Sequence, residues 1–295
     1  MVDFSNNDIK DINLLNNKNK QIVTWGISSL GLTKYQSTNR IDRKIKVAIL
    51  DSGINKEHED LKGKVIKEFN AINPKEKVRD DFGHGTAIAG VVAAENNKVG
   101  IVGVNPNVDI YSVKVLDKKG KGDVESLIKG IKWSIKNKVQ VINISFGMPS
   151  DHPELHKIIT KAISSGIIVV AASGNNYGMN VDYPAKYKDV ISVTAVNKNY
   201  KTKPVYSAKG KIDFALPGDS ILTTSWNGQY EEYKGSSFAA AYMTGLVSLI
   251  LENSNEFKLD REKEHLTNSV IKILKDHSIK LGDQRIYGNG FVKLS

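Results

Sequence analysis

The stretch VAILDSGI, residues 47–54, decides the fold, because a run of apolar residues stops abruptly at an acidic residue and a glycine turn. An apolar run without alternation is typical of a strand that is buried on both faces of a parallel sheet. Four further runs share this character. They are DIYSVKVL (109–116), VQVINIS (139–145), GIIVVAA (166–172) and VISVTAV (190–196).

Helical patterns lie between these strands. Apolar residues recur at helical spacing over residues 124–135 after Asp123, a good N-cap, and residues 152–165 supply a second crossover helix. The alternation predicts the α/β class, with a doubly wound, mostly parallel sheet and helices on both faces. Two C-terminal helices are expected around residues 246–251 and 269–277, and the Gly-rich segment 285–294 predicts a final hairpin or edge strand.

Composition limits the class of protein. A chain of 295 residues is accommodated by one large domain, and we expect residues 1–20 to be an extension and residues 21–295 a single domain. The formal charge of +10 comes from scattered lysines, so no nucleic-acid partner is expected. The chain contains no cysteine, which excludes disulfides and thiolate chemistry. No apolar run reaches the roughly 20 residues of a membrane-spanning helix.

Three short segments carry reactive side chains: Asp51 follows a predicted strand, while His84 in DFGHGTAIAG and Ser237 in GSSFAAA each open a predicted helix. Each alone has an ordinary interpretation as a cap, turn or loop residue. Parallel strands bring their carboxyl ends to one edge of the sheet, so these side chains can converge there. A serine hydroxyl needs an imidazole to take its proton, and the imidazole needs a carboxylate to orient it.

The order Asp, His, Ser within DSGI, HGT and G-[ST]-S-x-A resembles the subtilisin-like serine protease family, and the likeness runs from about Gln21 to Val292. The resemblance implies a serine endopeptidase that acts on a peptide or protein substrate. It also places Asn175, in AASGNN (171–176), as a donor to the oxyanion beside the backbone N–H of Ser237. A plain Gly-Asn turn is the alternative for Asn175.

The resemblance further implies that an extended substrate pairs with two glycine-containing segments, although both are also plausible turns. Asp182, in VDYPAKY (181–187), would lie near the floor of the pocket for the residue before the scissile bond, where a carboxylate selects Arg or Lys. An Asx turn ahead of Tyr183-Pro184 is an equal alternative. The predicted substrate-binding residues are Gly120, Lys121, Gly122, Ser145, Phe146, Gly147 and Asp182.

Calcium (Ca²⁺) is the cofactor that the resemblance implies, because oxygen donors like those of the family's tight site are present. A polar loop after a helix is the alternative interpretation of ENNKVGIVGVNP, residues 95–106. The predicted metal ligands are Gln21, Asp60, Asn97 and the carbonyl groups of Glu95, Val99 and Ile101. A weaker cation site near Asp213 has little support.

The start of the chain lacks the basic and apolar pattern of a secretory signal, so a cytoplasmic enzyme is expected, or a secreted one if an upstream precursor region was omitted. Four apolar residues between Ile9 and Leu15 either dock the extension on the domain or belong to a frayed tail. We expect processing of a peptide or protein precursor, as in lantibiotic leader peptidases. General protein turnover, or a catalytically silent peptide-binding or nucleic-acid-binding protein, are the alternatives, and the oligomeric state is not predicted.

Overall fold

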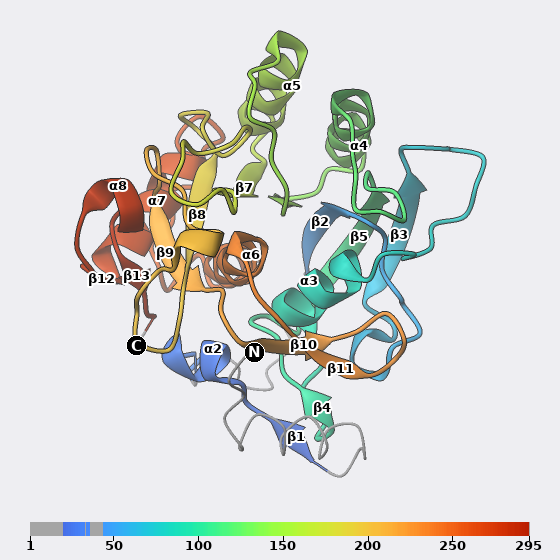
Figure 1. Ribbon diagram of the computed structural model, residues 1–295, viewed down its shortest axis with the longest axis horizontal. Helices are drawn as coiled ribbons and strands as arrows, with labels where there is room; N and C mark the ends of the chain where they lie inside the picture. The colour runs from blue at the N-terminus through green and yellow to red at the C-terminus, as the bar shows by residue number, and fades with distance from the viewer. Residues whose placement is uncertain (1–19, 33, 36–43, 295) are drawn as a thin grey trace.

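A computed structural model describes residues 20–32, 34–35 and 44–294, and these form an α/β fold around one large sheet (Figure 1). The sheet has nine strands in the order β12-β13-β9-β8-β7-β6-β2-β5-β3. Its strands are β2 (Ile45–Asp51), β3 (Val65–Asn70), β5 (Val108–Lys114), β6 (Val141–Ile144), β7 (Ile168–Ala172), β8 (Ile191–Val196), β9 (Phe214–Pro217), β12 (Ser278–Ile279) and β13 (Phe291–Val292). Every pairing except β12 with β13 is parallel, so the predicted fold class is confirmed.

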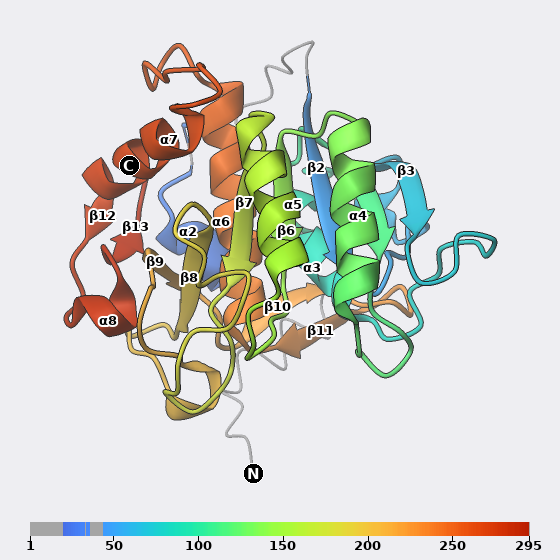
Figure 2. The same ribbon diagram turned by 90° about the horizontal axis from the view of Figure 1, so that it is seen from above.

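Helices cover both faces of this sheet. On one face lie α4 (Val124–Lys136) and α5 (Pro153–Ser164), which stand side by side in Figure 2. On the other lie α3 (His84–Ala93), α6 (Ser236–Glu252), α7 (Leu266–Asp276) and the short α2 (Trp25–Ser29). The apolar core is accordingly divided into two main clusters, one on each side of the sheet.

Local sequence explains the character of these helices. Asp123 caps α4 as predicted, because its Oδ1 accepts a hydrogen bond of 2.7 Å from the backbone N–H of Ser126. The other face is different: nearly every residue of α3 and α6 is buried, so both helices run through the interior. Because both helices are buried, the residues of their first turns, which include His84 in α3 and Ser237 in α6, are held in fixed positions relative to the sheet.

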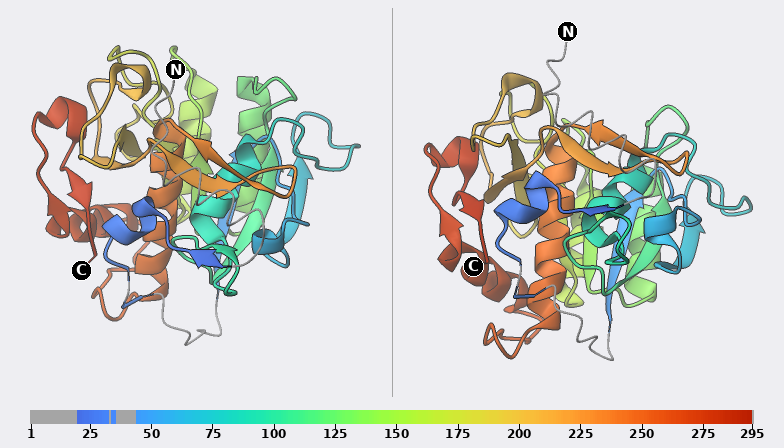
Figure 3. Two further views of the ribbon diagram at one scale, coloured as in Figure 1. Left: turned by 60° about the horizontal axis from the view of Figure 1, so that its bottom comes forward. Right: turned by 90° about the horizontal axis from the view of Figure 1, so that it is seen from below.

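Two small sheets border the buried helices (Figure 3). One pairs β1 (Gln21–Ile22) with β4 (Gly100–Ile101) in parallel. The other is an antiparallel hairpin of β10 (Ile221–Thr224) and β11 (Tyr230–Tyr233). The hairpin lies against α3, since the hydroxyl groups of Thr223 and Thr224 donate to the carbonyls of Ala87 and Thr86.

The prediction for residues 285–294 was wrong in its details. The segment starts inside a short helix, α8 (Gln284–Tyr287), and continues into β13. β13 is not an edge strand, because it pairs with β9 on one side and β12 on the other. Residues 9–15 lie outside the described part of the chain. Within the described part, no helix has the length and apolar character needed to cross a membrane.

Candidate active site

Asp51 and His84 meet at the carboxyl end of β2, a central strand of the sheet. Asp51 is the last residue of β2 and is fully buried, while His84 is the first residue of α3. Both carboxylate oxygens lie close to Nδ1 of His84, Oδ1 at 2.8 Å and Oδ2 at 2.9 Å. An Nδ1 that faces a carboxylate carries the ring proton, so Nε2 is left as the basic nitrogen.

Two opposing effects set the pKa of His84. Burial lowers the pKa of this imidazole, but the charge of Asp51 and the hydrogen bond to Asp51 raise it, and the charge of Asp80 raises it further. The net result is a pKa of His84 above its ordinary value. The site therefore favours the imidazolium form that a general base must adopt during catalysis.

Ser237 lies in the first turn of α6, which contacts His84 through the next residue along the helix. The ring of Phe238, the next residue, packs edge-on against the His84 ring with centroids 5.8 Å apart. The hydroxyl of Ser237 donates to the carbonyl of Ser145 at 2.7 Å, and within the described residues no hydrogen bond joins it to His84. Redirecting this proton to His84 requires the Ser237 hydroxyl to turn away from the Ser145 carbonyl, and catalytic hydrogen bonds often align only once substrate is bound.

Asn175 follows β7, and its side chain contacts the start of α6. Its Oδ1 accepts hydrogen bonds of 2.9 Å from both the backbone N–H and the hydroxyl of Ser236. A Cβ added at Gly235 would lie 3.0 Å from Nδ2 of Asn175, so this amide nitrogen is next to the turn that precedes Ser237. With its oxygen occupied, the side chain presents Nδ2 as a donor to another acceptor.

The backbone of the first predicted substrate segment is used within its own loop. The N–H of Lys121 donates to Oδ1 of Asp117, and the carbonyl of Lys121 accepts from the N–H of Asp117. The main-chain groups of Lys121 are therefore occupied within its own loop. Gly120 packs against the Phe82 ring, and Gly122 lies near Phe146, so the two segments come together through side chains.

Asp182 lies between the second substrate segment and the strand that leads to Asn175. A Cβ added at Gly147 would lie 2.5 Å from Cβ of Asp182, and one added at Gly174 would lie 2.5 Å from its Oδ2. Burial raises the pKa of Asp182, and a hydrogen bond from Asn176 opposes this rise. Within the described residues, no Lys or Arg forms an ion pair with Asp182, and its carboxylate caps no following backbone N–H.

The six predicted metal ligands come together around β4. The amide nitrogen of Gln21 lies 2.8–3.2 Å from three carbonyl oxygens, which belong to Glu95, Val99 and Ile101 and share its two N–H donors. Asp60 is buried nearby, and its Oδ1 accepts a 3.5 Å hydrogen bond from Asn97. The structure thus points the nitrogen of Gln21, not the predicted oxygen, at the carbonyls, because converging carbonyl oxygens require a donor or a cation.

The donor set around β4 has the composition that calcium prefers, with one carboxylate, side-chain amides and backbone carbonyls. Burial raises the pKa of Asp60 to about 6, although hydrogen bonds from Ile101 and Tyr230 oppose the rise. No group of three or more His, Cys, Asp or Glu side chains in the described part of the chain could hold a metal ion. A carboxylate-rich metal centre is therefore absent from those residues. Near Asp213, the ammonium of Lys211 already contacts Oδ2 at 2.6 Å.

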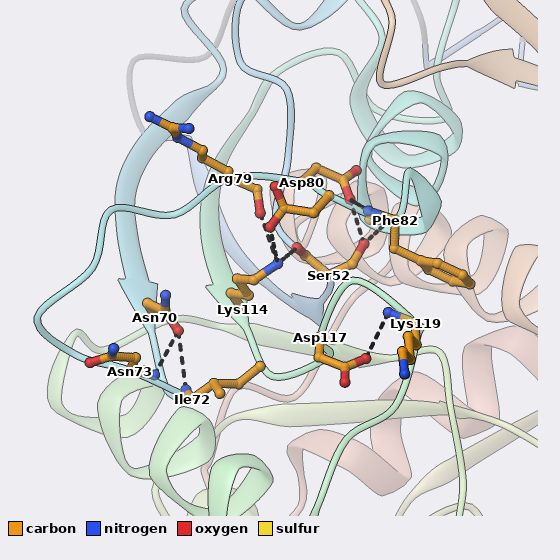
Figure 4. A network of polar contacts seen from close by, with 12 residues as sticks. Ser52, Asn70, Ile72, Asn73, Arg79, Asp80, Phe82, Lys114, Asp117 and Lys119 are labelled. Carbon is orange, nitrogen blue, oxygen red and sulfur yellow. Dashed lines mark hydrogen bonds and ion pairs between the residues drawn. The ribbon is translucent and has the colours of Figure 1, made fainter.

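A polar network behind Asp51 was not predicted (Figure 4). Ser52 follows Asp51, and its hydroxyl donates to the buried carboxylate of Asp80 at 2.7 Å. The ammonium of Lys114 donates to the carbonyls of Ser52 at 2.7 Å and Arg79 at 2.9 Å. One signal in the sequence could have revealed this network. Asp80 lies three residues before Gly83, and a glycine at a helix N-cap needs a capping side chain from another residue.

Comparison with known proteins places these residues in a family context. A model described as "Subtilase family" matches residues 42–290, which contain Asp51, His84, Asn175 and Ser237 but not Gln21. Subtilisin from Bacillus pumilus is 36% identical over 280 residues, covering 93% of this chain and 98% of that protein. Subtilisin amylosacchariticus from Bacillus subtilis subsp. amylosacchariticus is also 36% identical over 280 residues, covering 93% and 71%. The intracellular serine protease of Paenibacillus polymyxa is 36% identical over 264 residues, covering 86% and 80%.

Proposed function

Because this chain belongs to the subtilase family and is a subtilisin-like serine endopeptidase, we propose that Ser237 is its nucleophile, His84 its general base and Asp51 the carboxylate that orients His84. The observation that carries this proposal is the contact of both Asp51 oxygens with Nδ1 of His84. This contact fixes the tautomer in which Nε2 can accept a proton.

In this mechanism the Ser237 oxygen attacks the peptide carbonyl while its proton passes to Nε2 of His84. The carbonyl oxygen becomes an oxyanion that accepts hydrogen bonds from Nδ2 of Asn175 and the backbone N–H of Ser237. His84 then gives the proton to the leaving amine as the C–N bond breaks. A water molecule, deprotonated by His84, cleaves the Ser237 ester and restores the hydroxyl.

A serine-directed phosphonate probe tests this assignment. We expect covalent labelling of the unchanged enzyme and its loss in Ser237→Ala, with kcat lowered on the order of 10⁶-fold, the size known for triad serine proteases. Ser248→Ala, on the same helix, serves as the control and should retain labelling. Failure of the folded, unchanged enzyme to label would support instead a catalytically silent peptide-binding or nucleic-acid-binding protein.

We propose that the enzyme cleaves after Arg or Lys and thereby processes a precursor. The support is that the carboxylate of Asp182 lies between Gly147 and Gly174 without a described cationic partner. In a peptide panel, Asp182→Ser should reduce cleavage after Arg or Lys by roughly 10- to 100-fold, because the substrate cation loses its partner. Asp189→Ser, an exposed change of equal charge, is the control. A preference of the unchanged enzyme for Phe or Leu would favour general turnover.

We also propose that Asp60, Asn97, the carbonyls of Glu95, Val99 and Ile101 and the side-chain oxygen of Gln21 bind Ca²⁺, with the Gln21 amide turned over so that its oxygen replaces its nitrogen beside the carbonyls. The support is the convergence of three carbonyl oxygens on one position beside a buried carboxylate. The ion would supply stability rather than chemistry, because it would crosslink β1 and the loop before β4. A chelator should lower the melting temperature of the unchanged enzyme, whereas Asp60→Asn should be insensitive to it. An equal melt with and without chelator contradicts the site.

Two broader expectations remain proposals. The family match over residues 42–290 supports a catalytic domain over residues 21–295 preceded by an extension. The likeness to the intracellular serine protease of Paenibacillus polymyxa supports a cytoplasmic site of action. Removal of residues 2–18 tests the extension, since an inhibitory extension predicts a higher peptide turnover without it. Fractionation of cells tests the cytoplasmic site of action.

A further inference from the structure

Helix α3 begins without a capping side chain of its own. Its N-cap is Gly83, whose φ of 94° is left-handed. The missing cap is supplied by Asp80, which is buried. Its Oδ1 accepts the backbone N–H of Gly83 at 2.7 Å, and its Oδ2 accepts the backbone N–H of Thr86 at 2.9 Å. One carboxylate thus satisfies donors on both sides of His84.

Ser52 connects this cap to Asp51. The N–H of Ser52 donates to Oδ1 of Asp51 at 2.8 Å, and its hydroxyl donates to Oδ1 of Asp80 at 2.7 Å. The same hydroxyl oxygen accepts the N–H of Gly85 at 2.9 Å. The carbonyl of Ser52 is in turn bound by Lys114 (Figure 4). A single residue therefore ties the end of β2 to the first turn of α3.

We propose that Asp80 is a positioning residue for His84, which, with Ser52, fixes the first turn of α3 against Asp51 and supplies a second negative charge that stabilises the imidazolium. This inference rests on the proposed role of His84 as general base. It assigns the enzyme an acidic residue outside the triad whose effect reaches the reaction through His84 alone.

The charged groups around His84 determine the direction in which its pKa changes when Asp80 is removed. Asp51 faces the ring from β2, and Asp80 acts on it from the loop before α3. The ring neighbours Phe82 and Phe238 are uncharged. Lys114, from β5, directs its ammonium to the carbonyls of Ser52 and Arg79 and to Asp81.

A general base works as the neutral imidazole, so activity is lost as the pH falls through the pKa of His84. That pKa is raised, and Asp80 is one cause of the rise. Removing the charge of Asp80 must therefore lower the pKa of His84 and move the acid limb of kcat/KM to lower pH. A residue that only stabilised the helix would leave this limb where it is.

The test compares Asp80→Asn, Ser52→Ala and a matched control, each profiled for kcat and KM against pH. Asp80→Asn should lower kcat by about tenfold or more, leave KM within about twofold, and shift the acid limb by about half a pH unit or more to lower pH. Ser52→Ala should lower kcat by about tenfold without moving the limb, because the charge remains. The control is Asp283→Asn, which removes a carboxylate cap from the remote α8, where Oδ1 of Asp283 accepts the N–H of Arg285 at 2.8 Å. Asp283→Asn should leave kcat, KM and the position of the acid limb unchanged.

An unmoved acid limb and an unchanged kcat in folded Asp80→Asn would overturn the inference, whatever the change in melting temperature. If Asp80→Asn does not fold, Ser52→Ala decides, since an unchanged kcat there rules out positioning through this network and a tenfold loss supports it. Ser237→Ala separates the two levels of proposal. An active Ser237→Ala sinks the proposed function itself, whereas an inactive Ser237→Ala beside a normal Asp80→Asn sinks only the inference.

Discussion

The first turns of α3 and α6 are built alike and differ in charge. Each helix follows a glycine with positive φ, 94° at Gly83 and 138° at Gly235, and neither glycine has a side chain to cap the helix. Each first turn carries a proposed reactive residue. Each receives its cap from a side chain outside the helix. The carboxylate of Asp80 caps α3, and the neutral amide of Asn175 caps α6.

The difference matches the charge that each turn would stabilise in the proposed mechanism. The N-terminus of a helix carries partial positive charge, which disfavours an imidazolium and favours an oxyanion. At α3 the negative charge of Asp80 opposes this field, so His84 can accept a proton. At α6 the neutral Asn175 leaves the field intact and adds the Nδ2 donor. In the proposed mechanism, a cap from a side chain outside the helix thus serves opposite charges through the choice of acid or amide.

Exchanging the amide for an acid at α6 should have the largest effect on this comparison. In Asn175→Asp the Nδ2 donor is lost and a negative charge stands beside the oxyanion, so we expect kcat to fall by more than the roughly 10²–10³-fold typical of losing one donor. Steady-state cleavage of a peptide substrate measures this loss. The control is Asn253→Asp, at the other end of the same helix, which should leave kcat unchanged. A loss of less than tenfold in Asn175→Asp would contradict the assigned role.

The two glycines offer a smaller and asymmetric test. A Cβ at Gly235 would lie 3.0 Å from Nδ2 of Asn175, whereas one at Gly83 would lie 2.6 Å from the ring of Trp226, which is 52% exposed and can move aside. Gly83→Ala strains a left-handed backbone by roughly 1–2 kcal/mol. Gly235→Ala places a side chain at φ 138° and ψ 163°, a region essentially restricted to glycine, at a cost of roughly 1–3 kcal/mol. Gly235→Ala should therefore lower kcat by about tenfold, and Gly83→Ala should mainly lower the melting temperature. Thermal melts and kcat measurements of both variants test this difference. Equal losses of kcat in Gly235→Ala and Gly83→Ala would contradict it.

The sequence allowed prediction of the strands and of the residues at their ends, because apolar runs and the order of DSGI, HGT and GSS are local signals. The caps were harder to predict. Asp80 is close to His84 in the chain, but its bond to Ser52 spans 28 positions and depends on how β2 and α3 pack. The pairing of β13 with β9, between Phe291 and Ala215, is also long-range, which is why residues 285–294 were misassigned. The orientation of the Gln21 amide depends on three carbonyls more than 70 positions away.

Ser236 gives the smallest expected effect and the finest test of the amide cap. Its hydroxyl and its backbone N–H both donate to Oδ1 of Asn175 at 2.9 Å, and Ser236→Ala removes only the first of these bonds. A single hydrogen bond is worth about 0.5–1.5 kcal/mol, so kcat should fall by about two- to tenfold with KM unchanged. If the hydroxyl acts by holding Asn175, this loss must disappear when Asn175 is already Ala. A double-mutant cycle measures that coupling, and fully additive losses would show that Ser236 acts on something other than the amide.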